Sequence, residues 1–317
     1  MADTAHSFFD MHKQGFVRVG TSTPCCRPAD VAYNTAGVIS EAKRAHECHV
    51  DLLVYPELTL SSYAIDDLHL QAALLDRVER GVAEVVEASA ELSPVLVIGA
   101  PLRRNGKIYN CALVIAGGEL LGAVPKSYLP NYREFYEKRY FAHGRECQDL
   151  WIAVAGEEVP FGTDLVFASA KLPGFTFGVE ICEDFWAPNP PGTLAALAGA
   201  NILCNLSASP VTIGRAEDRH LHCRSSSSRS MCAYVYSASG HGESTTDLSW
   251  DGQGVIYELG TLLKDSERFD LEPELCIVDV DTDRIALERM RNGTFNDAAE
   301  AHGRPEDSVR RIVFEHN

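Results

Sequence analysis

Short apolar runs alternate with segments of helical periodicity along most of this chain, and that rhythm limits its fold more than any other feature. The apolar runs predict buried strands at 52–55, 95–99, 175–181, 201–206 and 233–237. Helical periodicity is found at 30–48, 70–90, 193–200 and 215–231, with Asp30 as the expected N-cap of the first helix. Alternating helices and strands predict an α/β fold.

A hairpin within this rhythm indicates that the sheets are mixed. Two strand-like runs, 110–115 and 120–124, are separated by Gly117 and Gly118. The run 276–280 is expected to be the last strand, and the charged tail after it resembles an exposed helix or arm. We therefore expect one domain over residues 1–280, followed by a C-terminal connector or arm over 281–317.

Charge and cysteine use narrow the range of functions. The 317 residues include 45 acidic and 28 basic side chains, a net charge of −17, which argues against a nucleic-acid partner. Apolar runs fall short of the roughly 18–20 residues of a membrane span, and a secretory leader is not expected. Many of the ten cysteines lie in apolar runs without a CxxC pair, which favours reduced thiols and a cytoplasmic protein.

Three predicted strands end in side chains that could form one active site. Glu57 follows Tyr55-Pro56, Lys126 follows Val124-Pro125, and Cys182 follows an apolar strand. Taken singly, each has an ordinary interpretation as a loop residue. Together they supply a base, a cation and a thiol, the parts of a covalent amide-cleaving site. The carboxylates beside Cys182 would raise its pKa, so a working thiol needs a cation nearby.

Other constellations give weaker signals. His220 and His222 are two residues apart and do not share a helix face, which disfavours a metal site with Cys223. A cysteine–histidine site would need a histidine partner for Cys182, and none of the eleven is singled out. The glycines at 240 and 242 lack the following Lys-Ser/Thr of a phosphate loop.

Several long motifs in a fixed order carry a family resemblance. The segments PELTLSSYAIDDL, VPKSYLPNYREFYEKR, EICEDFW and NLSASPVTIGRAEDR resemble the nitrilase, or carbon–nitrogen hydrolase, superfamily. Within it they are most similar to the glutaminase domains of glutamine-dependent NAD synthetases, over residues from about 10 to about 300. The resemblance implies a four-layer αββα sandwich of two mixed sheets and a homo-oligomer.

The resemblance also assigns roles to residues. It implies that Cys182 attacks the amide carbon of glutamine, Glu57 transfers protons, and Lys126 stabilises the oxyanion. Glu137 is implied to orient Lys126, with Glu134 as the less favoured choice. The implied glutamine pocket consists of Tyr132, Glu183, Ser209 and Arg215. The resemblance implies a hydrolysis that uses no metal or cofactor.

The chain departs from these synthetases in one large respect. Their ATP-dependent domain carries a Ser-Gly-Gly-x-Asp-Ser loop, and no such segment occurs here. ATP and Mg²⁺ would belong to that missing domain, which is expected as a partner that uses the ammonia to amidate deamido-NAD. The chain could be a fragment or a free-standing subunit. It could also be an amidase of another small amide, or a regulatory or scaffold subunit that is silent without its synthetase partner.

Overall fold

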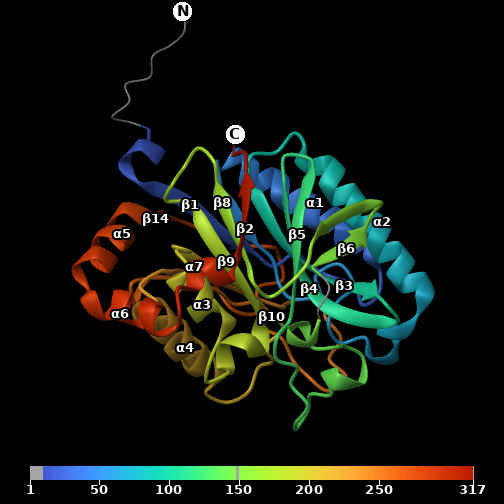
Figure 1. Cartoon of the computed structure of the whole chain (residues 1–317). Helices are drawn as coiled ribbons and strands as arrows, with labels where there is room; N and C mark the ends of the chain where they lie inside the picture. The colour runs from blue at the N-terminus through green and yellow to red at the C-terminus, as the bar shows by residue number, and fades with distance from the viewer. Residues whose placement is uncertain (1–9, 148–149, 317) are drawn as a thin grey trace, which may run out of the picture.

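The computed structural model describes residues 10–147 and 150–316, so part of the N-terminal segment examined for a secretory leader lies outside the described residues. Two large sheets form the centre of the molecule. The first has the strand order β14-β1-β2-β3-β4-β5 and the second β13-β12-β11-β10-β9-β8-β15. A separate hairpin pairs β6 with β7. Figure 1 shows α1 and α2 on one side of the strands and α3 to α6 on the other.

The strands of the first sheet are β1 (Phe16–Ser22), β2 (Leu52–Val54), β3 (Val95–Arg104), β4 (Lys107–Ala116), β5 (Glu119–Pro125) and β14 (Leu275–Asp281). Those of the second are β8 (Leu165–Ser169), β9 (Thr176–Ile181), β10 (Ile202–Ser207), β11 (Ala233–Ala238), β12 (Gly254–Glu258), β13 (Thr261–Asp265) and β15 (Arg310–Phe314). The hairpin strands are β6 (Trp151–Val154) and β7 (Glu157–Pro160).

The α-helices are α1 (Val31–Glu47), α2 (Ala72–Ser89), α3 (Pro191–Leu197), α4 (Arg215–Arg229), α5 (Thr282–Arg291), α6 (Gly293–Ala301) and α7 (Pro305–Ser308). The short 3-10 helices are η2 (His12–Gln14), η3 (Asp66–Leu70), η4 (Glu137–Arg139), η5 (Gly144–Glu146) and η6 (Cys182–Trp186). The predicted cap of α1 is confirmed, because the Asp30 carboxylate accepts a hydrogen bond from the backbone N–H of Tyr33.

Buried side chains form three apolar layers, which confirm the predicted αββα sandwich. Val97 and Val179 belong to the layer between the two sheets. Val38 of α1 and Val82 of α2 pack on the outer face of the first sheet. Cys223 of α4 packs with strand residues on the outer face of the second sheet. Burial of apolar surface on both faces of each sheet is the main force that holds the four layers together.

Strand directions bring several strand ends to one edge. In the first sheet β2 is parallel to β1 and β3, and two antiparallel pairings, β3–β4 and β4–β5, return β5 to the direction of β2. In the second sheet β9, β10 and β11 are parallel. The residues that follow β2 and β5 therefore emerge at the same edge of the first sheet.

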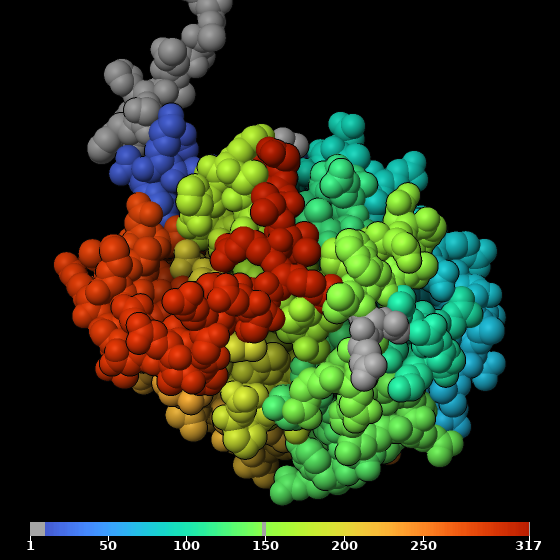
Figure 2. Space-filling view, in the orientation of Figure 1, coloured from blue at the N-terminus to red at the C-terminus, as the bar shows by residue number. Residues whose placement is uncertain are grey.

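The C-terminal segment differs from the sequence interpretation. The run 276–280 does form a strand, but it is not the last one, since β15 pairs in parallel with β8. The sequence Arg-Arg-Ile-Val-Phe is hard to identify as a strand, because two charged residues open it and it lies at the outermost position of the sheet, where most of its side chains are not buried. Figure 2 shows the red C-terminal segment lying across one face of the molecule. A domain boundary near residue 280 stays a proposal.

In the described ranges, which include all ten cysteines, no disulfide bond is formed. None of the helices in the described ranges is both long enough and apolar enough to cross a membrane.

Candidate active site

A buried lysine lies between two carboxylates at the common strand edge. Lys126 Nζ is 2.6 Å from Glu57 Oε1 and 2.7 Å from Glu137 Oε1. The three residues are 1%, 1% and 4% exposed, so water screens their charges little. Glu57 follows β2, Lys126 follows β5, and Glu137 begins η4. The structure thus brings together Glu57, Lys126 and Glu137, the residue preferred over Glu134.

Burial and charge pairing shift the pKa values of this cluster in opposite directions. Burial lowers the pKa of Lys126, but the carboxylates of Glu137 and Glu57 outweigh it and raise the pKa well above its usual value. Burial raises the pKa of Glu137 to about 7, although Lys126 acts in the opposite direction. The cluster therefore keeps its lysine charged and has a carboxyl group that can exchange a proton near neutral pH.

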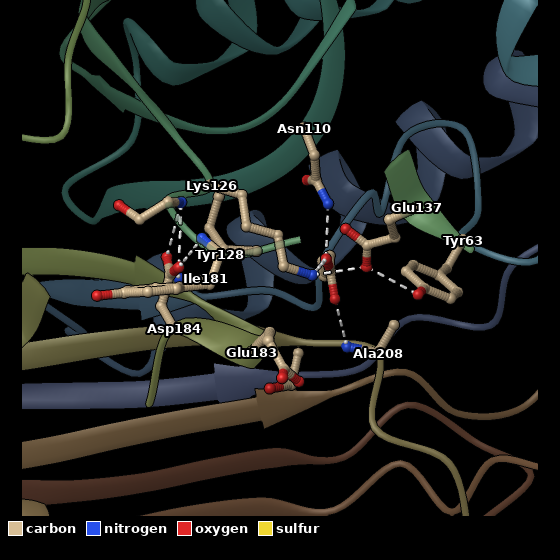
Figure 3. A network of polar contacts seen from close by, with 12 residues as sticks. Tyr63, Asn110, Lys126, Tyr128, Glu137, Ile181, Glu183, Asp184 and Ala208 are labelled. Atoms are coloured by element: carbon tan, nitrogen blue, oxygen red, sulfur yellow. Dashed lines mark hydrogen bonds and ion pairs between the residues drawn. The ribbon is translucent and has the colours of Figure 1, made fainter. Parts of the chain in front are cut away.

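Neutral hydrogen-bond donors fix the two carboxylates. Asn110 Nδ2 donates to Glu57 Oε1 at 2.6 Å, and the backbone N–H of Ala208, after β10, donates to Glu57 Oε2 at 2.9 Å. The Tyr63 hydroxyl donates to Glu137 Oε1 at 2.8 Å. Figure 3 shows these side chains converging on the Lys126 ammonium group. Because Ala208 directly follows β10 of the second sheet, this network also links the two sheets.

Cys182 occupies a strained turn directly after β9. It begins η6, and its φ of 44° lies in the left-handed region, which costs a non-glycine residue about 1–3 kcal/mol. Its side chain is buried, and burial raises the pKa of the thiol well above its usual value. Glu57 raises that pKa further, whereas Lys126 lowers it. The resting thiol is therefore protonated, and a nucleophilic thiolate requires transfer of its proton to a base.

Asp184 links the cysteine turn to the lysine loop, a role that the sequence analysis missed. Its carboxylate accepts backbone N–H groups from Ser127 at 3.0 Å, Tyr128 at 2.8 Å and Ile181 at 2.9 Å. Burial raises the pKa of Asp184 to about 8, against the effect of these N–H groups. The motif EICED placed three acids near Cys182, but spacing alone could not tell which one binds backbone.

The predicted glutamine-pocket residues form a more open group. The Tyr132 hydroxyl donates to Glu183 at 2.8 Å, and the Arg215 guanidinium lies 4.8 Å from the centre of the Trp186 ring. Tyr132 is 50% exposed, and the positive charge of Arg215 acts on both Tyr132 and Glu183. Burial raises the pKa of Glu183, and the Tyr132 hydrogen bond and Lys126 oppose that rise.

The two remaining candidates lie at the margins of the cluster. Ser209 is buried on the loop after β10 that also supplies the Ala208 N–H to Glu57. Glu134 lines a cavity of about 40 Å³ beside Glu137, together with Tyr63. A buried base–cation–thiol group next to a half-buried carboxylate and guanidinium can attack the amide of an amino-acid-like substrate.

Comparisons with known proteins identify the family and the relatives of this chain. The carbon-nitrogen hydrolase family model matches residues 18–289. The glutamine-dependent NAD(+) synthetases of Mycobacterium tuberculosis and Mycobacterium leprae are each 52% identical to the chain, over 97% of it and 45% of their own length. The chain thus spans less than half the length of these curated relatives.

Solved structures give the same picture. A glutamine-dependent NAD(+) synthetase from Cytophaga hutchinsonii has a TM-score of 0.75 and 25% identity, over 84% of this chain and 43% of that one. An amidase of the nitrilase superfamily from Nesterenkonia has a TM-score of 0.66 and 19% identity, over 86% and 94% of the two chains. The amidase supports the fold alone.

Proposed function

The chain belongs to the carbon–nitrogen hydrolase family, and on that premise we propose that it hydrolyses the side-chain amide of L-glutamine and releases ammonia. The observation that carries the proposal is the buried group of Glu57, Lys126 and Glu137 beside the strained Cys182. The high identity to glutamine-dependent NAD(+) synthetases supports glutamine as the substrate.

The first step forms a thioester. Glu57 takes the proton of the Cys182 thiol, and the sulfur attacks the amide carbon of glutamine. Lys126 and the backbone N–H of Glu183 stabilise the negative charge that develops on the amide oxygen, an effect worth about 10²–10³-fold in rate for one donor. Glu57 then passes its proton to the nitrogen, the carbon–nitrogen bond breaks, and ammonia leaves.

The second step restores the enzyme. Glu57 removes a proton from a water molecule, and the resulting oxygen nucleophile attacks the γ-glutamyl thioester on Cys182. The carbon–sulfur bond breaks, glutamate leaves, and the proton returns to the sulfur. Glu137 is a positioning residue in both steps, because it holds the Lys126 ammonium through the 2.7 Å contact and is itself held by Tyr63.

Opposite charges account for recognition of the amino-acid end. The Glu183 carboxylate pairs with the α-ammonium group of glutamine, and the Arg215 guanidinium pairs with its α-carboxylate. Tyr132 orients Glu183 through its hydroxyl, and Ser209 adds a polar wall. An amide without these two charged groups would lose both pairs.

The proposal extends to the fate of the ammonia. A synthetase domain or subunit that binds ATP and Mg²⁺ would use it to amidate deamido-NAD, with residues 1–280 as the glutaminase unit and 281–317 as the connector. We further propose a homo-oligomer and a cytoplasmic location, the latter because no disulfide bond joins any of the ten cysteines, all of which lie in the described ranges.

A panel of amides tests the substrate. We expect ammonia release from L-glutamine to exceed that from L-asparagine and from propionamide, which lacks both charged groups. A preference for propionamide would indicate a different small-amide hydrolase. If no amide is turned over but Cys182 reacts with a glutamine-like electrophile, the chain is silent until a synthetase partner binds.

A further inference from the structure

Two histidines meet one buried aspartate at the end of the sandwich opposite to the active site. His12 Nε2 is 3.0 Å from Asp51 Oδ1, and His316 Nε2 is 2.8 Å from the same oxygen. Asp51 directly precedes β2 and Glu57 follows it, so the two groups lie at opposite ends of one strand. His12 lies in η2 before β1, and His316 lies just after β15.

The donor atoms suit a tetrahedral metal ion. Donor atoms of His12, Asp51 and His316 all lie within 4.8 Å of one another. A zinc ion with bonds of about 2.0–2.1 Å sets its ligand atoms roughly 3.3 Å apart, so a small outward shift of each side chain would admit the ion. Two imidazoles and one carboxylate, with the fourth position left to water, form a common zinc ligand set.

The surroundings hold these ligands in place. Asp51 Oδ2 accepts the backbone N–H of Arg18 at 2.7 Å, and the His316 ring packs edge-on against Phe175, 5.2 Å between centres. Asp51 and His316 are 4% and 5% exposed.

The second nitrogen of His12 also has a suitable neighbour. His12 Nδ1 faces Asp10 Oδ1 at 3.9 Å, a gap that one water or a small rotation can bridge. In the metal-free protein both Nε2 atoms can donate N–H groups to Asp51. When an ion takes the Nε2 lone pair, the ring proton of His12 moves to Nδ1, where Asp10 can accept it. Outer carboxylates of this kind orient histidine ligands at metal sites.

A groove gives an ion access to this cluster. It has a volume of about 390 Å³, and Asp10, His12, Lys13 and Lys171 are among its lining residues. The nearby positive charges are already paired: Lys13 with Asp10 at 3.5 Å, Lys171 with Glu315 at 3.4 Å, and Arg18 with Asp279 at 2.7 Å.

We propose that His12, Asp51 and His316 bind one divalent transition-metal ion, with Zn²⁺ as the best match, and that the ion ties the two sheets together. The ion would join the segments before β1 and β2 in the first sheet to the segment after β15 in the second. Its role is structural, since the amide-cleaving cluster lies beyond the other end of β2. The inference is independent of the proposed hydrolysis.

Metal titration of the untagged, chelator-treated chain tests the proposal. We expect one equivalent of Zn²⁺ by competition with a chromogenic chelator, and Co²⁺ should give the visible absorption of a tetrahedral site. Because the ion binds only the folded state, Zn²⁺ at a hundredfold excess over its Kd should raise the Tm by roughly 3–8 °C.

His316→Gln separates the metal from the hydrogen bond. Its amide can still donate to Asp51 but is a poor metal ligand, so Zn²⁺ affinity should fall on the order of 100-fold while the metal-free Tm changes little. His12→Gln should lower Zn²⁺ affinity to a similar extent and likewise change the metal-free Tm little. His302→Gln is the matched control, because His302 is an exposed residue directly after α6 and its ring bonds only to the nearby Ala298 carbonyl.

Three results would overturn the proposal. The first is binding of less than one-tenth of an equivalent of Zn²⁺ by the parent chain. The second is unchanged affinity in the His12→Gln, His316→Gln double variant. The third is a strong near-ultraviolet charge-transfer band with Co²⁺, which would place the ion on cysteine thiolates.

Discussion

Two buried carboxyl groups or pairs of groups lie near Cys182, and they differ in the partners of their oxygen atoms. Glu57 and Glu137 share the Lys126 ammonium group, whereas Asp184 is held by three backbone N–H groups. Figure 3 shows the two networks as separate groups, with Lys126 in one and Asp184 in the other. The first contains groups that can exchange protons with a substrate. The second binds only backbone, so it can fix geometry but has no free atom for chemistry.

Of the variants in the two networks, Glu57→Gln should reduce kcat/KM for glutamine the most. The amide has nearly the same shape but cannot take the Cys182 proton, so kcat/KM for glutamine should fall by about 10²–10⁴-fold. Steady-state ammonia release measures the change. Glu134→Gln is the control, because Glu134 only lines the nearby cavity. Equal losses of kcat/KM in the two variants would show that Glu57 has no special role.

Lys126→Met should damage both activity and stability. Removing the cation deletes one oxyanion donor, worth about 10²–10³-fold in rate. It also leaves Glu57 and Glu137 buried without a counter-charge, at a cost of about 3–5 kcal/mol in the free energy of unfolding. Urea unfolding and kcat/KM measure the two effects. Lys171→Met, at an exposed ion pair, should be near neutral; equal stability of both variants would mean that the buried pairing contributes little.

Asp184→Asn should have a smaller effect on rate and a different signature. The amide cannot accept all three N–H groups, so the cysteine turn and the lysine loop shift slightly, and kcat should fall by up to about 10²-fold. The pH at which kcat/KM rises should stay in place, because Asp184 transfers no proton to the substrate. A displaced pH profile would instead place Asp184 among the catalytic residues.

The same variant tests the buried charge of Asp184 through stability. Burial raises the pKa of Asp184 from 3.8 to about 8, so the folded protein holds this proton to higher pH than the unfolded chain does. The associated stabilisation is complete below about pH 4 and is lost as the pH rises through about 8. Between about pH 5 and pH 8 the unfolding free energy of Asp184→Asn should therefore decline less than that of the parent. Asp67→Asn, at an exposed ion pair, should keep the parental slope; if Asp184→Asn keeps it too, Asp184 is ionised throughout.

Tyr132→Phe should have the smallest effect. It removes one partly exposed hydrogen bond to Glu183, so the KM for glutamine should rise roughly threefold to tenfold, with kcat almost unchanged. Tyr136→Phe is the matched control, because its hydroxyl contacts Asp66 and Asp247 instead. A larger KM change in Tyr136→Phe than in Tyr132→Phe would indicate that the glutamine pocket lies beside Tyr136 instead.

The residues of this site that follow apolar strands could be predicted from the sequence, whereas those that act through contacts with distant segments could not. Glu57, Lys126 and Cys182 follow apolar runs, so local pattern placed them at strand ends, and mixed sheets brought those ends together. Asn110 lies inside an apolar strand and is 53 residues from Glu57, and nothing local marks it as a donor to that carboxylate. The roles of Tyr63 and Asp184 likewise depend on contacts between distant segments.

The same limit applies to the ends of the fold. The strand β15 was missed because its charged residues fit an exposed outer strand as well as a loop. His316 and Asp51 are 265 residues apart, and no local sequence pattern marks either of them as part of a cluster. Only the pairing of β15 with β8 brings His316 to the start of β2.

The central claim is that Cys182 is the nucleophile of a glutamine-hydrolysing site, and labelling with 6-diazo-5-oxo-L-norleucine tests it most directly. Intact-mass and peptide mass spectrometry of the treated chain should show one adduct, located on Cys182. Excess L-glutamine should slow its formation, and Cys182→Ala should abolish both the adduct and ammonia release. An adduct on another of the ten cysteines, or ammonia release that survives in Cys182→Ala, would contradict the account.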